Sequence, residues 1–256
     1  MEVHSHTHSA ADPDSHRGRK KWTHYDWEFL MLFLAVFCGF LAEYQLEHKI
    51  EKDREKQFIR SLYYDIKADT TSFNRIILAR NIRETSQDSI LLLLNSATPA
   101  KYSKELYFHA VTAARTLTIR LLPNDGTMQQ LKNSGAFRLI RNRAIADSIA
   151  KYDVIIRSAL RQGEVEETLI HDYRSAAPRI FDALVFDKML DAENNPSRLT
   201  GESPALLPFD KKELAVFNYK LFSMKALNKA MRRDIKLLLR QAENLLSLLN
   251  KKYRLE

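Results

Sequence analysis

Glycine, proline and cysteine are scarce in this chain of 256 residues, which contains six, seven and one of them. The single cysteine, Cys38, cannot form an internal disulfide, so the fold must be stable without one. Few glycines and prolines leave few tight turns and few helix breaks, while leucine, alanine, lysine, arginine and glutamate are plentiful. The composition therefore predicts a helical protein.

Patterns that carry known chemistry are also missing. The sequence has no zinc-protease, phosphate-loop, nucleophile-elbow or dinucleotide-binding pattern, and six glycines are too few to favour a phosphate-cradling loop. His171 and Asp172 are adjacent, and adjacent residues of a helix do not face each other. We interpret His171 and His109 as ordinary helix residues. The sequence predicts no catalytic residue and no cofactor, and we expect a protein that is not an enzyme.

The charge balance is basic but gives no nucleic-acid signature. The net charge is +8 and the isoelectric point is about 9.4. Basic side chains alternate with acidic ones along the expected helices, which is typical of solvated helix faces. No motif of an RNA- or DNA-binding module is present, so we expect no nucleic-acid partner.

One long apolar run stands out near the start of the chain. No polar or charged residue other than Cys38 occurs from residue 29 to 42. This run spans roughly 21 Å as a helix, and the wider stretch from residue 25 to 46 spans roughly 33 Å, enough to cross a bilayer core of about 30 Å. The aromatic and apolar residues expected to anchor it are Trp27, Phe29, Phe33, Phe37, Phe40 and Tyr44.

Two alternatives remain open for this run, namely a buried core helix and a cleaved signal peptide. A signal-peptide cut before Glu43 would place Phe40 at a position that requires a small residue. The run is also apolar on every side, whereas a surface helix keeps a polar stripe. We therefore predict an uncleaved transmembrane anchor in a bacterial cytoplasmic (inner) membrane. Lysine and arginine before the run favour a cytoplasmic N-terminus and an outward-facing body.

Before the anchor, residues 1–24 read as a disordered, basic tail rich in histidine. His4, His6 and His8 alternate and are weak candidates for a metal site, since imidazole is a good ligand for transition metals. A flexible tail offers nothing to orient the ligands, so no functional metal is predicted.

After the anchor, the helical body is expected to occupy residues 47–256. Its long helices are predicted at 43–95, continuous with the anchor, at 143–177 behind an Asn142 cap, and at 210–253 behind an Asp210 cap. Short helices are expected at 104–117 and 127–133, helical structure at 179–190 and a surface loop at 191–208. The fold class is all-α: a transmembrane helix that runs into an elongated antiparallel helical bundle with coiled-coil character.

The last long helix carries the clearest periodic pattern. Apolar residues recur at 3,4 spacing from Leu214 to Leu249, and Asn228 is the one polar residue in this seam. A polar residue in such a seam can fix the register of the packed helices. The period alone leaves open whether the seam packs inside the chain or pairs with a second chain.

One segment outside the long helices is a candidate partner surface. Asn124, Asp125 and Thr127 lie at the turn before the second short helix, and Arg138 lies just after that helix. Exposed turns of this kind often carry function, although turn and cap residues also have a structural explanation.

Three segments carry a resemblance to a known family. They are FLAEYQ at residues 40–45, EKQFIRSLYYDI at 55–66 and TMQQLKNSGAFRLI at 127–140, followed by Asn142 and Tyr152. The chain resembles, over roughly residues 25–250, a family of single-pass membrane-anchored helical proteins of Bacteroidota-type bacteria, classed as a domain of unknown function. The resemblance implies a membrane location and a helical body. It implies no catalytic or binding residues.

Together these observations predict a structural or protein-interaction module anchored in the lipid bilayer, which binds another protein or itself through its coiled-coil helices. The alternative is an outward-facing helical bundle that senses a ligand and needs a separate output partner.

Overall fold

The computed structural model describes residues 20–116, 118–193 and 195–255. Its contacts divide the chain into two compact units, Met1–Arg54 and Glu55–Glu256. Over the described residues every regular element is a helix, which confirms the predicted all-α class. The helices are α1 Lys20–Leu94, η1 Pro99–Tyr102, α2 Ser103–Ala114, α3 Gly126–Asn133, η2 Ala136–Leu139, α4 Arg143–Ala176, η3 Ala177–Arg179, α5 Ala183–Asp187 and α6 Lys211–Tyr253, where η marks a short 3₁₀ helix.

Helix α1 begins earlier than the sequence predicted. Residues 1–24 were expected to be a disordered tail, but residues 20–24 already belong to α1. The physical reason is that helix propagation adds one hydrogen bond for each residue fixed, and no glycine or proline follows Gly18 until Gly39. The predicted metal candidates His4, His6 and His8 lie outside the described residues.

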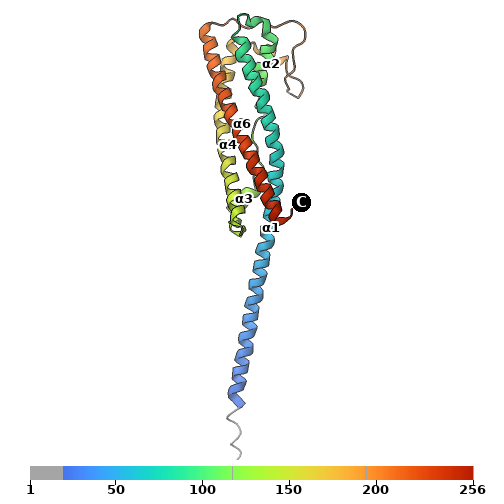
Figure 1. Cartoon of the computed structure of the whole chain (residues 1–256), viewed down its shortest axis with the longest axis vertical. Helices are drawn as coiled ribbons and strands as arrows, with labels where there is room; N and C mark the ends of the chain where they lie inside the picture. The colour runs from blue at the N-terminus through green and yellow to red at the C-terminus, as the bar shows by residue number, and fades with distance from the viewer. Residues whose placement is uncertain (1–19, 117, 194, 256) are drawn as a thin grey trace, which may run out of the picture. The chain divides into compact units, whose positions relative to one another are not determined.

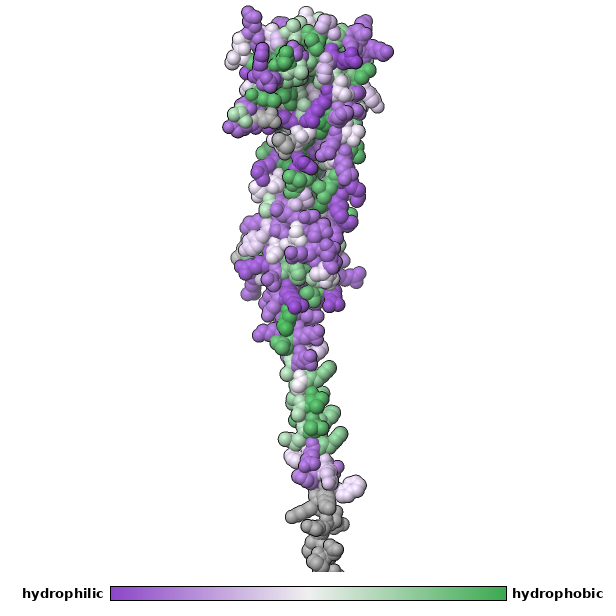
Figure 2. All heavy atoms as spheres, turned by 180° about the vertical axis from the view of Figure 1, so that it is seen from behind, coloured by the Kyte–Doolittle hydropathy of each residue, from purple (hydrophilic) through white to green (hydrophobic). Residues whose placement is uncertain are grey.

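The first unit contains the apolar part of α1. Every side chain from residue 24 to 47 is exposed, and Figure 2 shows a continuous green band of apolar side chains there. The most apolar 18-residue window of α1 has a mean hydropathy of 1.9, and among the described residues α1 is the one helix long and apolar enough to cross a membrane. Since none of that window is buried, the alternative of a buried core helix finds no support.

The second unit begins at Glu55, later than the body start predicted at residue 47. The intervening residues are mostly charged and exposed. They have no apolar face to pack against other helices, so the first buried apolar residue of α1 is Ile59. At the base of this unit the Tyr253 hydroxyl donates to Glu55 at 2.5 Å.

Three long helices form the frame of the second unit. Hydrogen bonds join Asp69 to Tyr152 and Arg80 to Glu166, so α4 runs in the same direction as α1. Helix α6 runs in the opposite direction to both, as Figure 1 shows. The connection from α1 to α4 is made by η1 and α2, a non-helical stretch, and then α3 and η2. In place of a fourth long helix, the bundle therefore has short helices and an irregular segment.

The predicted seam of α6 is confirmed as the buried face of that helix. Its buried residues are Phe217, Leu221, Met224, Asn228, Met231, Ile235, Leu238, Ala242, Leu245 and Leu249. All of them except Asn228 and Met231 belong to the two apolar clusters that also contain residues of α1 and α4. The seam therefore packs against other helices of the same chain.

The apolar core of the second unit consists of two clusters. One contains the buried apolar residues within positions 59–76 of α1, 145–159 of α4 and 235–249 of α6. The other gathers the ends of α1 and α4, the start of α6, and α2. The part of each long helix between the two clusters carries polar residues, which the next section describes.

Local signals predicted the helix ends well in most places. The Asn142 side chain accepts from the Ile145 N–H, and Asp210 forms a capping box with Glu213. Gly135 ends the α3 region with a φ of +68°. The prediction was wrong at residues 179–190, where only Ala183–Asp187 is an α-helix. Pro178 interrupts the backbone hydrogen bonding there, and the chain after it folds into a short helix capped by Asp182.

Candidate functional site

A polar layer separates the two apolar clusters of the body. It consists of Arg80, Arg83 and Gln87 of α1, Glu166 of α4 and Asn228 of α6, and all five residues are at most 5% exposed. These residues occupy core-facing positions of their helices, since on α1 the 3,4 spacing of buried positions continues from Ile59 through the layer to Leu94. The helices therefore place charged groups where apolar groups normally pack.

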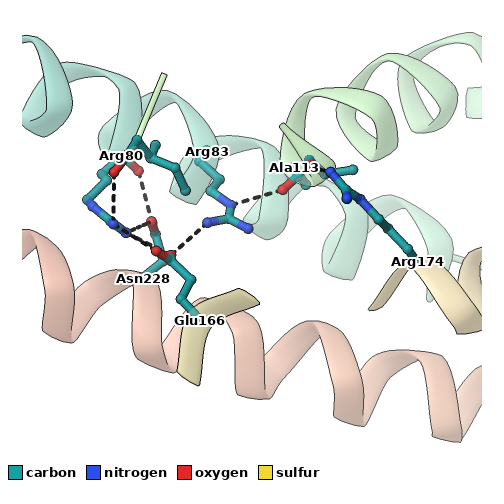
Figure 3. A network of polar contacts seen from close by, with 8 residues as sticks. Arg80, Arg83, Ala113, Glu166, Arg174 and Asn228 are labelled. Atoms are coloured by element: carbon teal, nitrogen blue, oxygen red, sulfur yellow. Dashed lines mark hydrogen bonds and ion pairs between the residues drawn. The ribbon is translucent and has the colours of Figure 1, made fainter. Parts of the chain in front are cut away.

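Glu166 is the centre of the hydrogen bonding in this layer. Arg80 donates from its two terminal nitrogens to the two Glu166 carboxylate oxygens at 2.8 Å each, and Arg83 donates to Oε1 at 2.8 Å (Figure 3). Asn228 accepts from Arg80 at 3.1 Å and donates to the Arg80 carbonyl at 3.0 Å. Arg83 also donates to the Ala113 carbonyl of α2 at 2.9 Å.

The layer carries more positive than negative charge. Two guanidinium groups share one carboxylate, which leaves one formal positive charge in the core. Burial lowers the pKa of Arg83 to about 10, against the opposing attraction of Glu166. Arg83 therefore stays protonated at neutral pH. Arg80 Nε and Arg83 Nη2 have no hydrogen-bond partner among the described residues, and neither do the two polar atoms of the Gln87 amide.

A cleft of about 690 Å³ opens beside this layer, between α4 and the non-helical segment that follows α2. Arg80 and Glu166 contribute to its wall, and Gly163 of α4 leaves a core-facing position without a side chain. The other residues that line it are Thr116, Ile119, Arg120, Leu121, Leu122, Ala159, Leu160, Glu164, Glu167, Ile170, His171, Arg174 and Met231. Its volume lies within the range of about 300–1,000 Å³ typical of small-molecule sites.

A second polar cluster holds the turn before α3 in place. Asp69 of α1 accepts from the Asn124 N–H at 2.9 Å, from the Asn124 side chain at 2.8 Å and from the Tyr152 hydroxyl at 2.9 Å. Burial raises the pKa of Asp69, while these hydrogen bonds oppose the shift. Every oxygen of the carboxylate is used, so the cluster fastens the turn to α1 and α4 rather than offering an open site.

A basic groove runs along the exposed side of α6. It is lined by Lys229, Arg232, Arg233, Lys236, Leu237 and Arg240, with a volume of about 210 Å³. Lys229 and Arg232 pair with Glu84 of α1 at 3.4 and 3.0 Å, and Arg233 pairs with Asp234 at 3.3 Å. Lys236 and Arg240 are exposed at its far end. The groove can attract an acidic surface.

The predicted anchor residues lie together on the first part of α1. Trp27, Phe29, Phe33, Phe37, Phe40 and Tyr44 are between 48% and 71% exposed. Phe33 and Phe37 stack on each other with ring centres 5.9 Å apart. Large apolar side chains with this exposure have no protein core around them, and they present an apolar surface to their surroundings.

Of the four residues of the predicted partner surface, Asn124, Asp125 and Arg138 are exposed and Thr127 is buried. Asn124 is tied to Asp69, and Thr127 is buried. The Asp125 carboxylate accepts from Gln129 at 3.2 Å, and Arg138 is exposed. Asn124 and Thr127 therefore have structural roles at the turn.

Of the histidines considered from sequence, His171 lines the cleft and His109 contacts the Ser86 hydroxyl at 3.3 Å. Burial lowers the pKa of His109, with a contribution from the nearby Arg198. No group of three or more metal-binding side chains occurs among the described residues.

Sequence reasoning missed Arg80, Arg83 and Glu166. The available signal was spacing: Arg80 and Arg83 continue the 3,4 pattern of α1 beyond Ile76, and Gly163 and Glu166 interrupt the same pattern in α4. Charged residues at such positions are expected to pair with one another when the helices assemble.

Comparisons with protein-family models, with curated proteins and with solved structures gave no match to this chain.

Proposed function

We propose that this chain is a single-pass membrane-anchored helical protein whose body binds another protein. The observation that carries the anchoring is the apolar stretch of α1, in which every side chain from residue 24 to 47 is exposed. A contiguous apolar surface of this size is unfavourable in water and is stable in hydrocarbon. Trp27 and Tyr44 lie near its ends, where aromatic rings favour the headgroup region. The proposed location is the bacterial cytoplasmic membrane, with the N-terminus inside and the body outside.

Protease accessibility in intact spheroplasts tests this location and orientation. We expect external protease to digest the body while a cytoplasmic control protein survives, and alkaline carbonate to leave the chain in the membrane pellet. Extraction of the chain by carbonate would contradict the anchor. Protection of the body until the membrane is lysed would reverse the orientation while keeping the anchor.

The basic groove on α6 is the proposed contact surface for a protein partner. The apolar seam of α6 is already used inside the bundle, so it does not offer a free coiled-coil face. The groove, in contrast, presents five basic side chains around the half-exposed Leu237. Electrostatic complementarity speeds association and selects partners. An acidic protein segment with one apolar contact for Leu237 fits this surface.

Charge reversal tests the groove in the full-length protein. The double variant Lys236→Glu/Arg240→Glu is expected to reduce co-purification of crosslinked partners from native membranes at least fivefold. The matched control Lys251→Glu/Lys252→Glu makes the same change in net charge elsewhere on α6, at exposed residues, and should retain the partners. Equal recovery with both variants would exclude the groove as the contact surface.

A second candidate function is ligand sensing by the body, with a separate protein as output. The cleft favours it, because its size suits a small molecule and its wall contains a buried charged pair. Sites of this kind lie between the helices of bundles, and this cleft lies between α4 and the non-helical segment, with Arg80 of α1 and Met231 of α6 in its wall.

A further inference from the structure

We propose that the cleft binds an organic monoanion, a carboxylate attached to an apolar body, with its head next to Arg80. This inference rests on the second candidate function and names its ligand class. It is independent of the protein contact proposed for α6.

The buried charge provides the first argument. Arg80 is 1% exposed, lines the cleft, and has an Nε–H group without a partner among the described residues. Arg80 and Arg83 share only one carboxylate, that of Glu166. Buried donors and buried charges are costly when unpaired, so an incoming anion would satisfy an N–H group and balance the excess charge.

The shape of α4 provides the second argument. Buried positions on α4 follow a 4,3 spacing through Ile156 and Ala159 to Glu166, and Gly163 falls in this series. A Cβ atom added at Gly163 would meet no atom within 4 Å. A core-facing position is thus left unfilled beside the charged pair, where most bundles place a side chain.

The remaining lining defines the chemistry of the ligand. Apolar groups from Leu121, Leu160 and Met231 suit an aliphatic or aromatic body. Arg120 and Arg174 add positive charge, whereas the exposed Glu164 and Glu167 add negative charge. The acidic groups act against a ligand with several negative charges. One carboxylate with an apolar body therefore fits better than a phosphate or a polyanion.

The test uses the full chain in nanodiscs of neutral lipid and isothermal titration calorimetry. The probes are 4-phenylbutyrate and octanoate, each compared with its neutral amide, 4-phenylbutyramide and octanamide. Empty nanodiscs give the background from partition into lipid. We expect both carboxylates to bind with a dissociation constant below 1 mM and at least tenfold more tightly than their amides.

Gly163 gives a matched pair of variants. Gly163→Leu places a side chain in the cleft and should weaken carboxylate binding at least tenfold, while Gly163→Ala should retain most of it. Both changes raise helix propensity, so the melting temperature should not fall. Arg120→Gln, at an exposed lining residue, should weaken binding about threefold or more.

Several outcomes would overturn the proposal. They are no binding of either carboxylate, equal binding of acids and amides, or unchanged binding in a folded Gly163→Leu variant. If Gly163→Leu melts below the parent, circular dichroism and the binding of Gly163→Ala decide between loss of fold and loss of the site. Retained binding in Lys236→Glu/Arg240→Glu would show that the ligand site and the protein contact are separate.

Discussion

At the scale of single residues, burying the charges of the polar layer costs free energy, and removing one of the paired groups costs more. A buried ion pair often contributes little net stability compared with an apolar replacement, but removal of one partner leaves an unpaired charge in the core. Asn228 adds two hydrogen bonds to Arg80 in the same layer. A shift of α6 along α1 would place these polar groups against the apolar clusters, so the layer can set the register of the bundle.

Neutralising the Glu166 carboxylate should lower the free energy of unfolding much more than removing one of the two guanidinium groups. In Glu166→Gln both arginines stay buried without a counter-charge, and we expect a loss of about 3–5 kcal/mol in the free energy of unfolding. In Arg83→Met the Arg80–Glu166 pair remains and the formal charge of the layer becomes zero, so the loss should be smaller, about 1–2 kcal/mol. Urea unfolding of both variants measures the difference. Equal losses would mean that the net charge of the layer does not matter.

Tyr152→Phe should produce a destabilisation that depends on pH. The variant removes a hydrogen bond that lowers the pKa of Asp69, so the Asp69 pKa, already raised by burial, rises further. A raised pKa in the folded state means that the folded protein holds the Asp69 proton more tightly than the unfolded chain does. The associated stability is fully present below the unfolded pKa of 3.8 and is lost as pH rises through the folded pKa. The extra shift therefore costs stability at pH 7 and not below pH 3.8.

Urea unfolding at pH 3.5 and pH 7 tests this expectation. The loss for Tyr152→Phe should be about 1–3 kcal/mol at pH 7 and clearly smaller at pH 3.5. Tyr219→Phe, at an exposed tyrosine of α6, is the control and should change neither value. A larger loss in acid than at pH 7 would contradict the proposed sign.

At the scale of the helices, the capping box at the start of α6 is a local source of stability. Asp210 accepts from the Glu213 N–H at 2.7 Å, and Glu213 accepts from the Asp210 N–H at 3.2 Å. Asp210→Ala removes one side of this box and leaves an N–H at the start of α6 unsatisfied. We expect a loss of about 1 kcal/mol, or about 2–4 °C in melting temperature for a body of this size. Lys212→Ala, two residues after the cap and exposed, serves as the control and should stay within about 0.5 kcal/mol of the parent.

The long helices show which buried positions could be predicted from the sequence. The seam of α6 was predicted residue by residue because nearly all its positions are apolar. In α1 the apolar spacing is interrupted between Ile76 and Ile90, since Arg80, Arg83 and Gln87 carry the spacing but not the apolar character. Their burial depends on Glu166 and Asn228, which come from distant parts of the chain. No local pattern contains that pairing, so the partners could not be predicted, although Asn228 was identified as the polar residue of its seam.

The irregular stretches were harder for a different reason. Residues 179–190 have helix-forming composition, yet only five of them form an α-helix, Ala183–Asp187. Nearby, the Asp182 N–H donates to the Tyr107 hydroxyl at 2.8 Å, and Phe181 packs against the Tyr107 ring. Tertiary contacts with α2 thus override local propensity at this position.

At the scale of the whole molecule, the body should fold without the apolar part of α1. Every residue of the two apolar clusters lies beyond Glu55. A fragment of residues 55–256 is therefore expected to be soluble without detergent and to unfold in one cooperative transition, whereas the full chain should require detergent. Circular dichroism and size-exclusion chromatography of the fragment test this. Aggregation or loss of cooperativity would show that the first unit contributes to the fold.

Both tryptophans of the chain, Trp22 and Trp27, lie in the first unit, and all the aromatic residues of the body are tyrosine or phenylalanine. Tryptophan emission on excitation at long wavelength therefore reports only on the surroundings of the anchor. Near-ultraviolet bands of tyrosine such as Tyr107 and Tyr173 report on the packing of the body. The wild-type protein thus carries its own pair of optical probes, and membrane insertion and unfolding of the body can be followed separately in one sample without labelling.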